Sequence, residues 1–252
     1  MFDEKGIKMD FTYEAYVELI KLLKKHGYQI ANYHNHSSCE RAAILRHDVD
    51  YSLDDSLRMA ELERSIGEGV SSTYFVLLSS DFYNIASAEG KRIVRDIHAL
   101  GHEIGLHFDE TLYHYETLDI VECIRKESNI MEQILEVPIS AVSMHRPSPR
   151  TLQADLRIPG MINAYGSLFF NEFKYLSDSR RHWREDIKGI IEKGQYDKLQ
   201  ILTHAFWYKK EAETLESTVK TFVNHANFDR YKRLDHNIKD LGAIMAEEEI
   251  EG

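Results

Sequence analysis

The sequence predicts an α/β fold built from parallel β/α units, with a barrel favoured over an open sheet. Short apolar runs of strand length alternate along the 252 residues with longer segments of helical spacing. Five of these runs also end in polar residues of the kinds that hold metals or move protons. No GxGxxG or P-loop motif follows an expected strand, so a nucleotide-cradling sheet of the Rossmann or Walker type is not supported.

The first part of the chain already shows the alternation. Residues 11–25 have the spacing of an amphipathic helix, and residues 28–33 and 43–47 are expected strands. Ser52 is a suitable N-cap for a helix that is expected to run to Gly67.

The rest of the chain repeats this pattern. Further strands are expected at 72–78, 103–107, 140–144, 162–165, 174–176 and 199–203. Helices are expected between and after them at 89–100, 118–135, 186–193 and 211–224. No linker or internal repeat divides the chain, so we expect a single domain over 1–252, with a core at about 28–210 and helical extensions at both ends.

The composition excludes several classes of protein. The formal net charge of −11 argues against nonspecific nucleic-acid binding, which needs a basic face. The two cysteines, Cys39 and Cys123, form neither a disulfide framework nor a metal-binding spacing. We see no secretory signal pattern, and no apolar stretch approaches the ~20 residues that a membrane span needs. We therefore expect a cytoplasmic protein without a membrane span.

Polar side chains follow five expected strands at the points where the strands end. The carboxyl ends of parallel strands meet at one rim, so these side chains are expected to gather there. They are His47, Asp48 and Asp50 after 43–46, His107 and Asp109 after 103–106, His145 and Arg146 after 140–144, Asp178 after 174–176, and His204 after 199–203. This combination predicts a metal-assisted hydrolase rather than a binding module.

Asp48 and Asp50 project to the same side of an extended segment. Two carboxylates on one face repel each other unless a cation lies between them or one is protonated. One can then bind a metal while the other accepts a proton from water. The alternative is that these residues cap the helix that follows.

The remaining rim residues have roles that their types suggest. His107 and His145 are candidate metal ligands. Arg146 can orient the general-base Asp or bind a substrate carboxylate or phosphate, unless it belongs to a proline-stiffened surface loop. Asp178 is a candidate substrate contact or helix cap, and Trp207, just after His204, is a candidate aromatic wall for a sugar.

The motifs RHDVD, TYF, GHEIGLH, HRP and LTH occur in this order between residues 43 and 208. This set resembles the polysaccharide deacetylase superfamily (NodB homology, carbohydrate esterase family 4), and in particular a divergent HDVD branch associated with surface-polysaccharide biosynthesis. The resemblance implies a distorted (β/α)7 TIM-like barrel and a divalent metal, commonly zinc. It also implies hydrolysis of an N-acetyl or similar amide on a sugar.

Carried over by position, the resemblance implies that Asp48 is the catalytic base and that Asp50 and His107 bind the metal. It further implies that Arg146 steadies the base and that His204 is the general acid, which protonates the leaving amine.

The sequence departs from the family pattern in two places. Val49 separates the two Asp residues, which are usually adjacent, so the division of roles between them is open. Thr111 occupies the position of the usual second metal-binding His. We expect His145 to replace that ligand, and Asp109 and His114 are the alternatives.

The expected location bears on the substrate. A cytoplasmic enzyme of this kind is expected to act on a sugar nucleotide or lipid-linked precursor, or on a small amide, rather than on finished polysaccharide. The competing hypotheses are a catalytically inactive relative that binds a sugar or partner, and a hydrolase of a non-sugar amide.

Overall fold

The computed structural model describes residues 9–113 and 118–250. His114, one of the alternative ligands, lies outside the described residues. The chain forms two compact units, Met1–Lys210 and Glu211–Gly252. The first contains the predicted core and the second the expected C-terminal extension, while the single-domain organisation stays a prediction.

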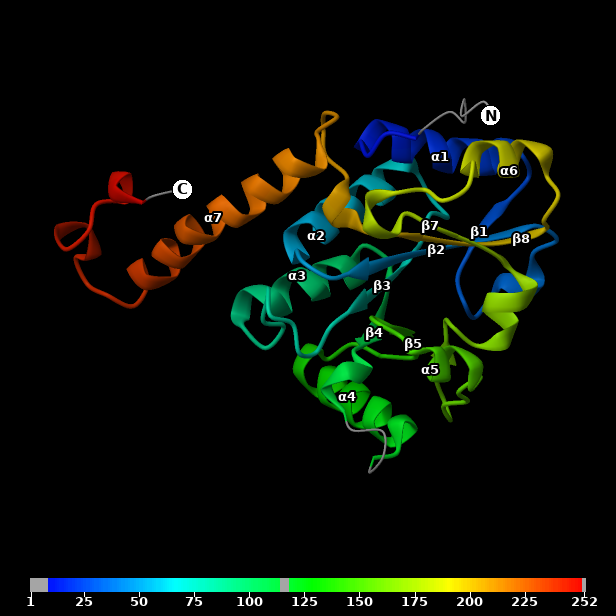
Figure 1. Ribbon diagram of the computed structural model, residues 1–252, viewed down its shortest axis with the longest axis horizontal. Helices are drawn as coiled ribbons and strands as arrows, with labels where there is room; N and C mark the ends of the chain where they lie inside the picture. The colour runs from blue at the N-terminus through cyan, green and yellow to red at the C-terminus, as the bar shows by residue number, and fades with distance from the viewer. Residues whose placement is uncertain (1–8, 114–117, 251–252) are drawn as a thin grey trace. The chain divides into compact units, whose positions relative to one another are not determined.

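Strands and helices alternate through the first unit as predicted (Figure 1). In chain order the elements are α1 (Tyr13–Lys25), β1 (Gln29–Ala31), β2 (Ala42–Val49), α2 (Leu53–Ile66), β3 (Thr73–Val76), α3 (Ala88–Ala99), β4 (Glu103–Phe108), α4 (Ile120–Leu135), β5 (Ala141–Met144), α5 (Pro149–Gln153), β6 (Ile162–Asn163), β7 (Lys174–Ser177), α6 (Ile187–Lys193) and β8 (Lys198–Thr203). The short helix α5 was not predicted; Ser148 caps it and Pro149 occupies its first turn.

The strands form one parallel sheet in the order β6-β5-β4-β3-β2-β8-β7, and β1 pairs beside the amino half of β2. Every strand pairing is parallel. The sheet curls into a half-barrel, and its two end strands, β6 and β7, do not pair within the described residues. The predicted α/β class and distorted barrel are confirmed.

Local signals explain where the helices begin. The Ser52 side chain accepts a hydrogen bond from the backbone N–H of Asp55, as expected of an N-cap. In the second unit, the helix predicted at 211–224 is instead α7 (Leu215–Asp235). It begins later because the Thr214 side chain caps the N–H of Ser217.

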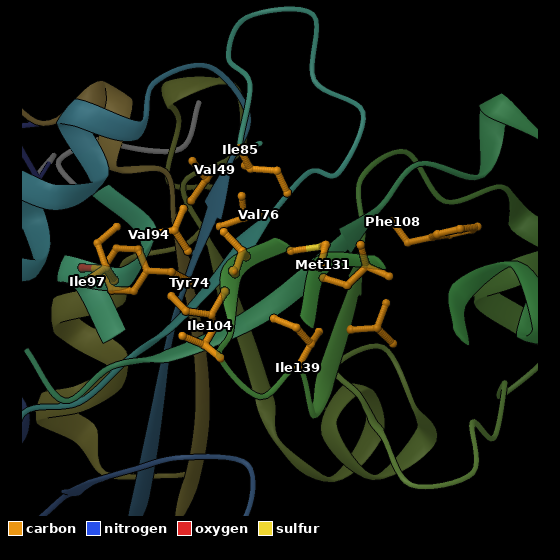
Figure 2. Packing of buried hydrophobic residues seen from close by; sticks show 14 of the residues in the cluster. Val49, Tyr74, Val76, Ile85, Val94, Ile97, Ile104, Phe108, Met131 and Ile139 are labelled. Carbon is orange, nitrogen blue, oxygen red and sulfur yellow. The ribbon is translucent and has the colours of Figure 1, made fainter. Parts of the chain in front are cut away.

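The main core lies between strands β3, β4 and β5 and helices α3 and α4. Figure 2 shows side chains such as Tyr74 and Ile104 from the strands packing with Val94, Ile97 and Met131 from the helices. All eight residues of β2 are buried, as is typical of a parallel strand that is covered on both faces.

This architecture places the candidate site residues. Strands β2, β4, β5, β7 and β8 all run parallel, so the residues that follow them lie at the same rim. Within the described part of the chain, no helix is both long and apolar enough to span a membrane.

Candidate metal centre

Strand β2 presents alternate residues to two different environments. Arg46 and Asp48 face the barrel interior, where both contact Ser143 of β5. His47 faces the other way and contacts Glu63 of α2. Asp50 follows the last strand residue and continues the side that carries Asp48. The RHDVD motif therefore supplies two separate clusters, one on each face of the strand.

The first cluster brings Asp50, His107 and His145 together at the rim. Asp50 Oδ1 lies 3.2 Å from His107 Nε2 and 3.2 Å from His145 Nδ1. The two imidazole nitrogens lie 3.1 Å apart. These three atoms therefore form a nearly equilateral triangle, and they come from the ends of β2, β4 and β5.

The triangle has the dimensions of a metal site. Ligand atoms around a tetrahedral zinc ion with bonds of about 2.0 Å are about 3.3 Å apart. Asp50 Oδ1 is buried and has no hydrogen-bond partner among the described residues, although two imidazole nitrogens are close to it. A carboxylate oxygen and two imidazole nitrogens that converge in this way can bind one cation together. The donor set therefore fits a small divalent metal.

The surroundings favour the ionised form of Asp50. Burial opposes ionisation, but contacts with His107 and His145 hold the pKa of Asp50 well below its ordinary range. Asp50 is thus anionic at neutral pH, as a carboxylate that binds a metal must be.

Asp48 lies next to the triangle and is held by an arginine that we did not predict. Arg46 Nη2 donates to Asp48 Oδ2 at 2.8 Å and to Ser143 Oγ at 2.7 Å, and the arginine side chain is fully buried. Burial raises the pKa of Asp48, but Arg46, His107 and His204 together outweigh it and lower this pKa below the ordinary value. Asp48 Oδ2 lies 3.8 Å from His107 Nε2.

The expected pairing of Arg146 with Asp48 is not formed. Arg146 is largely exposed, and its Nη2 instead donates to Asp109 Oδ2 and Thr111 Oγ1. The role expected of Arg146 is therefore filled by Arg46, whose side chain lies on the same strand face as Asp48. This pairing also gives Asp109 a partner outside the ligand triangle.

His204 lies on another side of the site, 3.7 Å from Asp50 Oδ2 through its Nε2 atom. Its Nδ1 donates to Asp178 Oδ1 at 2.6 Å, and its backbone N–H donates to Asp178 Oδ2 at 3.1 Å. Burial alone would lower the pKa of His204, but Asp178 raises it to about 9. His204 therefore has a proton to give.

This geometry corrects the role expected of Asp178. The side chain is completely buried and both of its oxygens accept hydrogen bonds from His204, so it does not present itself to a substrate. The hydrogen bonds with His204 make Asp178 a positioning residue.

A cavity of about 470 Å³ opens above the triangle. Its volume lies in the range typical of small-molecule sites. Trp207 lines it, as the aromatic-wall prediction requires, although the residue is only 8% exposed. The other lining residues are Asp50, Tyr51, Leu77, Ser79, Ser80, Asp81, Phe82, Asp109, His145, Arg146, Ser179, Arg180 and His204. Asp48 and His107 are buried and do not line the cavity.

Three functional residues were missed by the sequence reasoning. Arg46 precedes Asp48 by two positions, so strand alternation could have placed it on the same face. Ser143, two residues before His145, could have been found by the same rule. Tyr51 carried no such signal, because it follows the strand in a turn.

No family model and no curated protein matches the sequence. The structure is similar to the peptidoglycan deacetylase PdaC from Bacillus subtilis, with 15% identity over 82% of this chain and 98% of that one and a TM-score of 0.44. It is also similar to the polysaccharide deacetylase Bc1974 from Bacillus cereus (16% identity, 70% and 94% covered, TM-score 0.42). A CE4 family pseudoenzyme from Bacillus anthracis matches at 13% identity, with 74% and 64% covered and a TM-score of 0.41.

Proposed function

We propose that the protein is a metal-dependent hydrolase that removes an N-acetyl or similar acyl group from a sugar. The observation that carries the proposal is the triangle of Asp50, His107 and His145 with a buried carboxylate on one side and a hydrogen-bonded imidazole on another. A divalent ion held by the triangle, zinc by its donor set, would polarise the acyl carbonyl and lower the pKa of water.

Asp48 is the general base in this proposal. Arg46 keeps it ionised and fixes its orientation, and the carboxylate lies beside the triangle rather than in open solvent. It therefore accepts a proton only from a water at the triangle. As that water attacks the acyl carbon, the proton passes to Asp48.

His204 is the general acid. Asp178 holds Nδ1, so Nε2 remains to face the cavity and donate its proton to the leaving nitrogen. Protonation is needed because an amine leaves far more readily than an amide anion. Tyr51 and Trp207 form an apolar wall on which a sugar ring can stack.

The proposed substrate is an acylated sugar nucleotide or lipid-linked precursor of surface polysaccharide. A binding protein without activity and a hydrolase of non-sugar amides are the outcomes that the experiment must separate from it.

The test is acetate release by the zinc-reconstituted protein from N-acetylated sugars and sugar nucleotides, compared with the chelated protein and with Asp48→Asn. We expect release that needs the metal and is lost in Asp48→Asn. Full activity in Asp48→Asn would contradict the base assignment, and release only from non-sugar amides would contradict the sugar substrate. Binding of a sugar without any release would favour the binding-protein hypothesis.

A further inference from the structure

The cavity is lined by two chemically different groups of residues. Tyr51, Phe82 and Trp207 are aromatic (the aromatic wall), with Tyr51 centred 5.3 Å from Phe82 and 5.9 Å from Trp207. The second group is charged and includes Arg146 and Arg180 together with Asp81 and Asp109. A neutral sugar would use the aromatic wall but would leave the Arg180 guanidinium without a partner.

The two arginines differ in how far their charges are already balanced. Arg146 forms an ion pair with Asp109, and Asp81 also lies close enough to stabilise its charge. Arg180 is exposed and makes no ion pair or side-chain hydrogen bond with any residue in the described ranges. It is therefore the cation at this cavity whose charge the chain leaves unbalanced.

The backbone that carries Arg180 is unusual. Arg180 has φ 59° and ψ 30°, and Arg181 has φ 55°, so two consecutive arginines adopt the left-handed conformation. Residues with a Cβ rarely adopt this conformation, and it persists where the surrounding structure imposes it, often at functional sites. Here the turn Ser179–Arg181 follows β7 directly.

The same turn also fixes the proton donor. Asp178, which precedes the turn, is anchored by two hydrogen bonds from His204, and its backbone oxygen accepts from the N–H of His182. Ser177 and Ser179 are joined through their hydroxyls at 2.6 Å. Arg180 is thus displayed from a turn that is tied to His204 at its start and closed by a backbone hydrogen bond at its end.

We propose that Arg180 is the main ligand of an anion-binding subsite, and that the substrate is an acylated sugar that carries a phosphate or carboxylate group. This inference rests on the proposed function and narrows its substrate class. A guanidinium offers a planar fork of N–H donors that matches either anion in a bidentate pair. In this arrangement the aromatic wall stacks against the sugar ring and the acyl group lies at the triangle. Arg180 pairs with the phosphate or carboxylate of the substrate.

The test is calorimetric binding to the zinc-reconstituted protein. The probes are N-acetylglucosamine, its 1-phosphate, N-acetylmuramic acid as the carboxylate form, and inorganic phosphate. They are compared in the native protein, in Arg180→Gln, and in Arg184→Gln, a control on the same segment that is exposed and does not line the cavity. Thermal unfolding of each variant checks that it is folded.

We expect at least one anionic sugar to bind about 10-fold to 100-fold more tightly than the neutral sugar, as one charged hydrogen-bonded contact predicts. This preference should vanish in Arg180→Gln and persist in Arg184→Gln. The phosphate and carboxylate arms identify which anion is used. Equal binding of neutral and anionic sugars, a preference that survives Arg180→Gln, or no binding of any probe would overturn the subsite.

Acetate release measured on the same probes separates this inference from the proposed function. An anionic sugar that binds through Arg180 but is never deacetylated would contradict the proposed function and leave the subsite standing. Deacetylation of neutral and anionic sugars at equal kcat/KM would support the proposed function and contradict the subsite.

Discussion

Strand β2 separates two buried clusters that are made of the same residue types. On one face Asp48 and Asp50 meet His107, His145 and His204, and on the other Glu63 meets His47 and His102. Both clusters combine carboxylates with imidazoles. They differ in whether other residues supply hydrogen-bond partners for all of the buried polar atoms.

The cluster around Glu63 is complete and closed. Glu63 is fully buried, and its oxygens accept hydrogen bonds from Tyr16 at 2.6 Å, Ser72 at 2.5 Å and Tyr74 at 2.7 Å, with His47 Nε2 at 3.2 Å. Such a carboxylate has no capacity left for a ligand. Its role is to join helices α1 and α2 to the sheet.

The cluster around Asp50 is incomplete and lies under a cavity. Asp50 Oδ1 and His107 Nδ1 have no hydrogen-bond partners in the part of the chain that the structure describes. Unmet polar atoms in a buried site are costly unless something else binds them. The comparison shows that residue type alone does not identify a candidate metal site. Buried polar atoms that lack partners and lie beside a cavity are the more informative feature.

The largest effect is expected from Asp48→Asn. Removal of the general base should reduce kcat by about 10²-fold to 10⁴-fold. Metal content should stay at the native level, because Asp48 is not part of the triangle. Steady-state kinetics and elemental analysis on the same preparation check both statements, and loss of metal together with activity would make Asp48 a ligand instead.

The next largest difference is expected between variants of Arg46 and Arg146. Arg46→Met leaves Asp48 buried without its cation, so it should lower the free energy of unfolding by about 3–5 kcal/mol and reduce turnover. Arg146→Met removes an exposed guanidinium from the buried Asp109, which keeps its hydrogen bonds from Thr111, so stability should fall by only about 1 kcal/mol or less. Urea unfolding of both variants tests this. Similar losses in the two would contradict the assignment of Arg46 as the residue that holds Asp48.

Glu63→Gln should affect stability and leave the metal in place. Burial would raise the pKa of Glu63, but His47, His102 and Ser72 lower it to about 2, against an ordinary value of 4.5. A depressed pKa in the folded state adds stability above pH 4.5, and that stability is lost as the pH falls towards 2.

The size of this contribution is roughly 3 kcal/mol. The difference in unfolding free energy between the native protein and Glu63→Gln should therefore be largest near pH 7 and shrink between pH 4.5 and 2. A difference that does not change with pH would show that the charge of Glu63 contributes nothing.

The smallest effect is expected at the cavity wall. Trp207→Phe keeps an aromatic face, so kcat should be unchanged and KM for a sugar substrate should rise only a few-fold, about 1 kcal/mol or less of stacking energy. Steady-state kinetics resolves this. A fall in kcat comparable with that of Asp48→Asn would place Trp207 in the chemistry rather than at the wall.

The sequence was informative where local rules govern position. Parallel strands that end in polar residues placed Asp50, His107 and His145 at one rim, and the structure brings these three together. Strand alternation could also have revealed Arg46, but attention to the rim residues alone missed it. The pairing of His47 with Glu63 spans a strand and a helix, and no local pattern marks such a contact.

Asp178 shows a different limit. Its carboxylate is held by His204, which follows a different strand, and the left-handed turn at Arg180 and Arg181 has no glycine to signal it. The contact is tertiary, so the sequence pattern could not distinguish a substrate contact from a positioning residue.

The central claim is that the incomplete cluster binds a metal and the complete one does not. Elemental analysis after zinc reconstitution should compare the native protein with Asp50→Ala, His107→Ala, His145→Ala and Glu63→Gln. We expect about one ion per chain in the native protein and in Glu63→Gln, and loss of the ion in the other three variants. A native protein that binds no metal, or metal retained in all three ligand variants, would contradict the account.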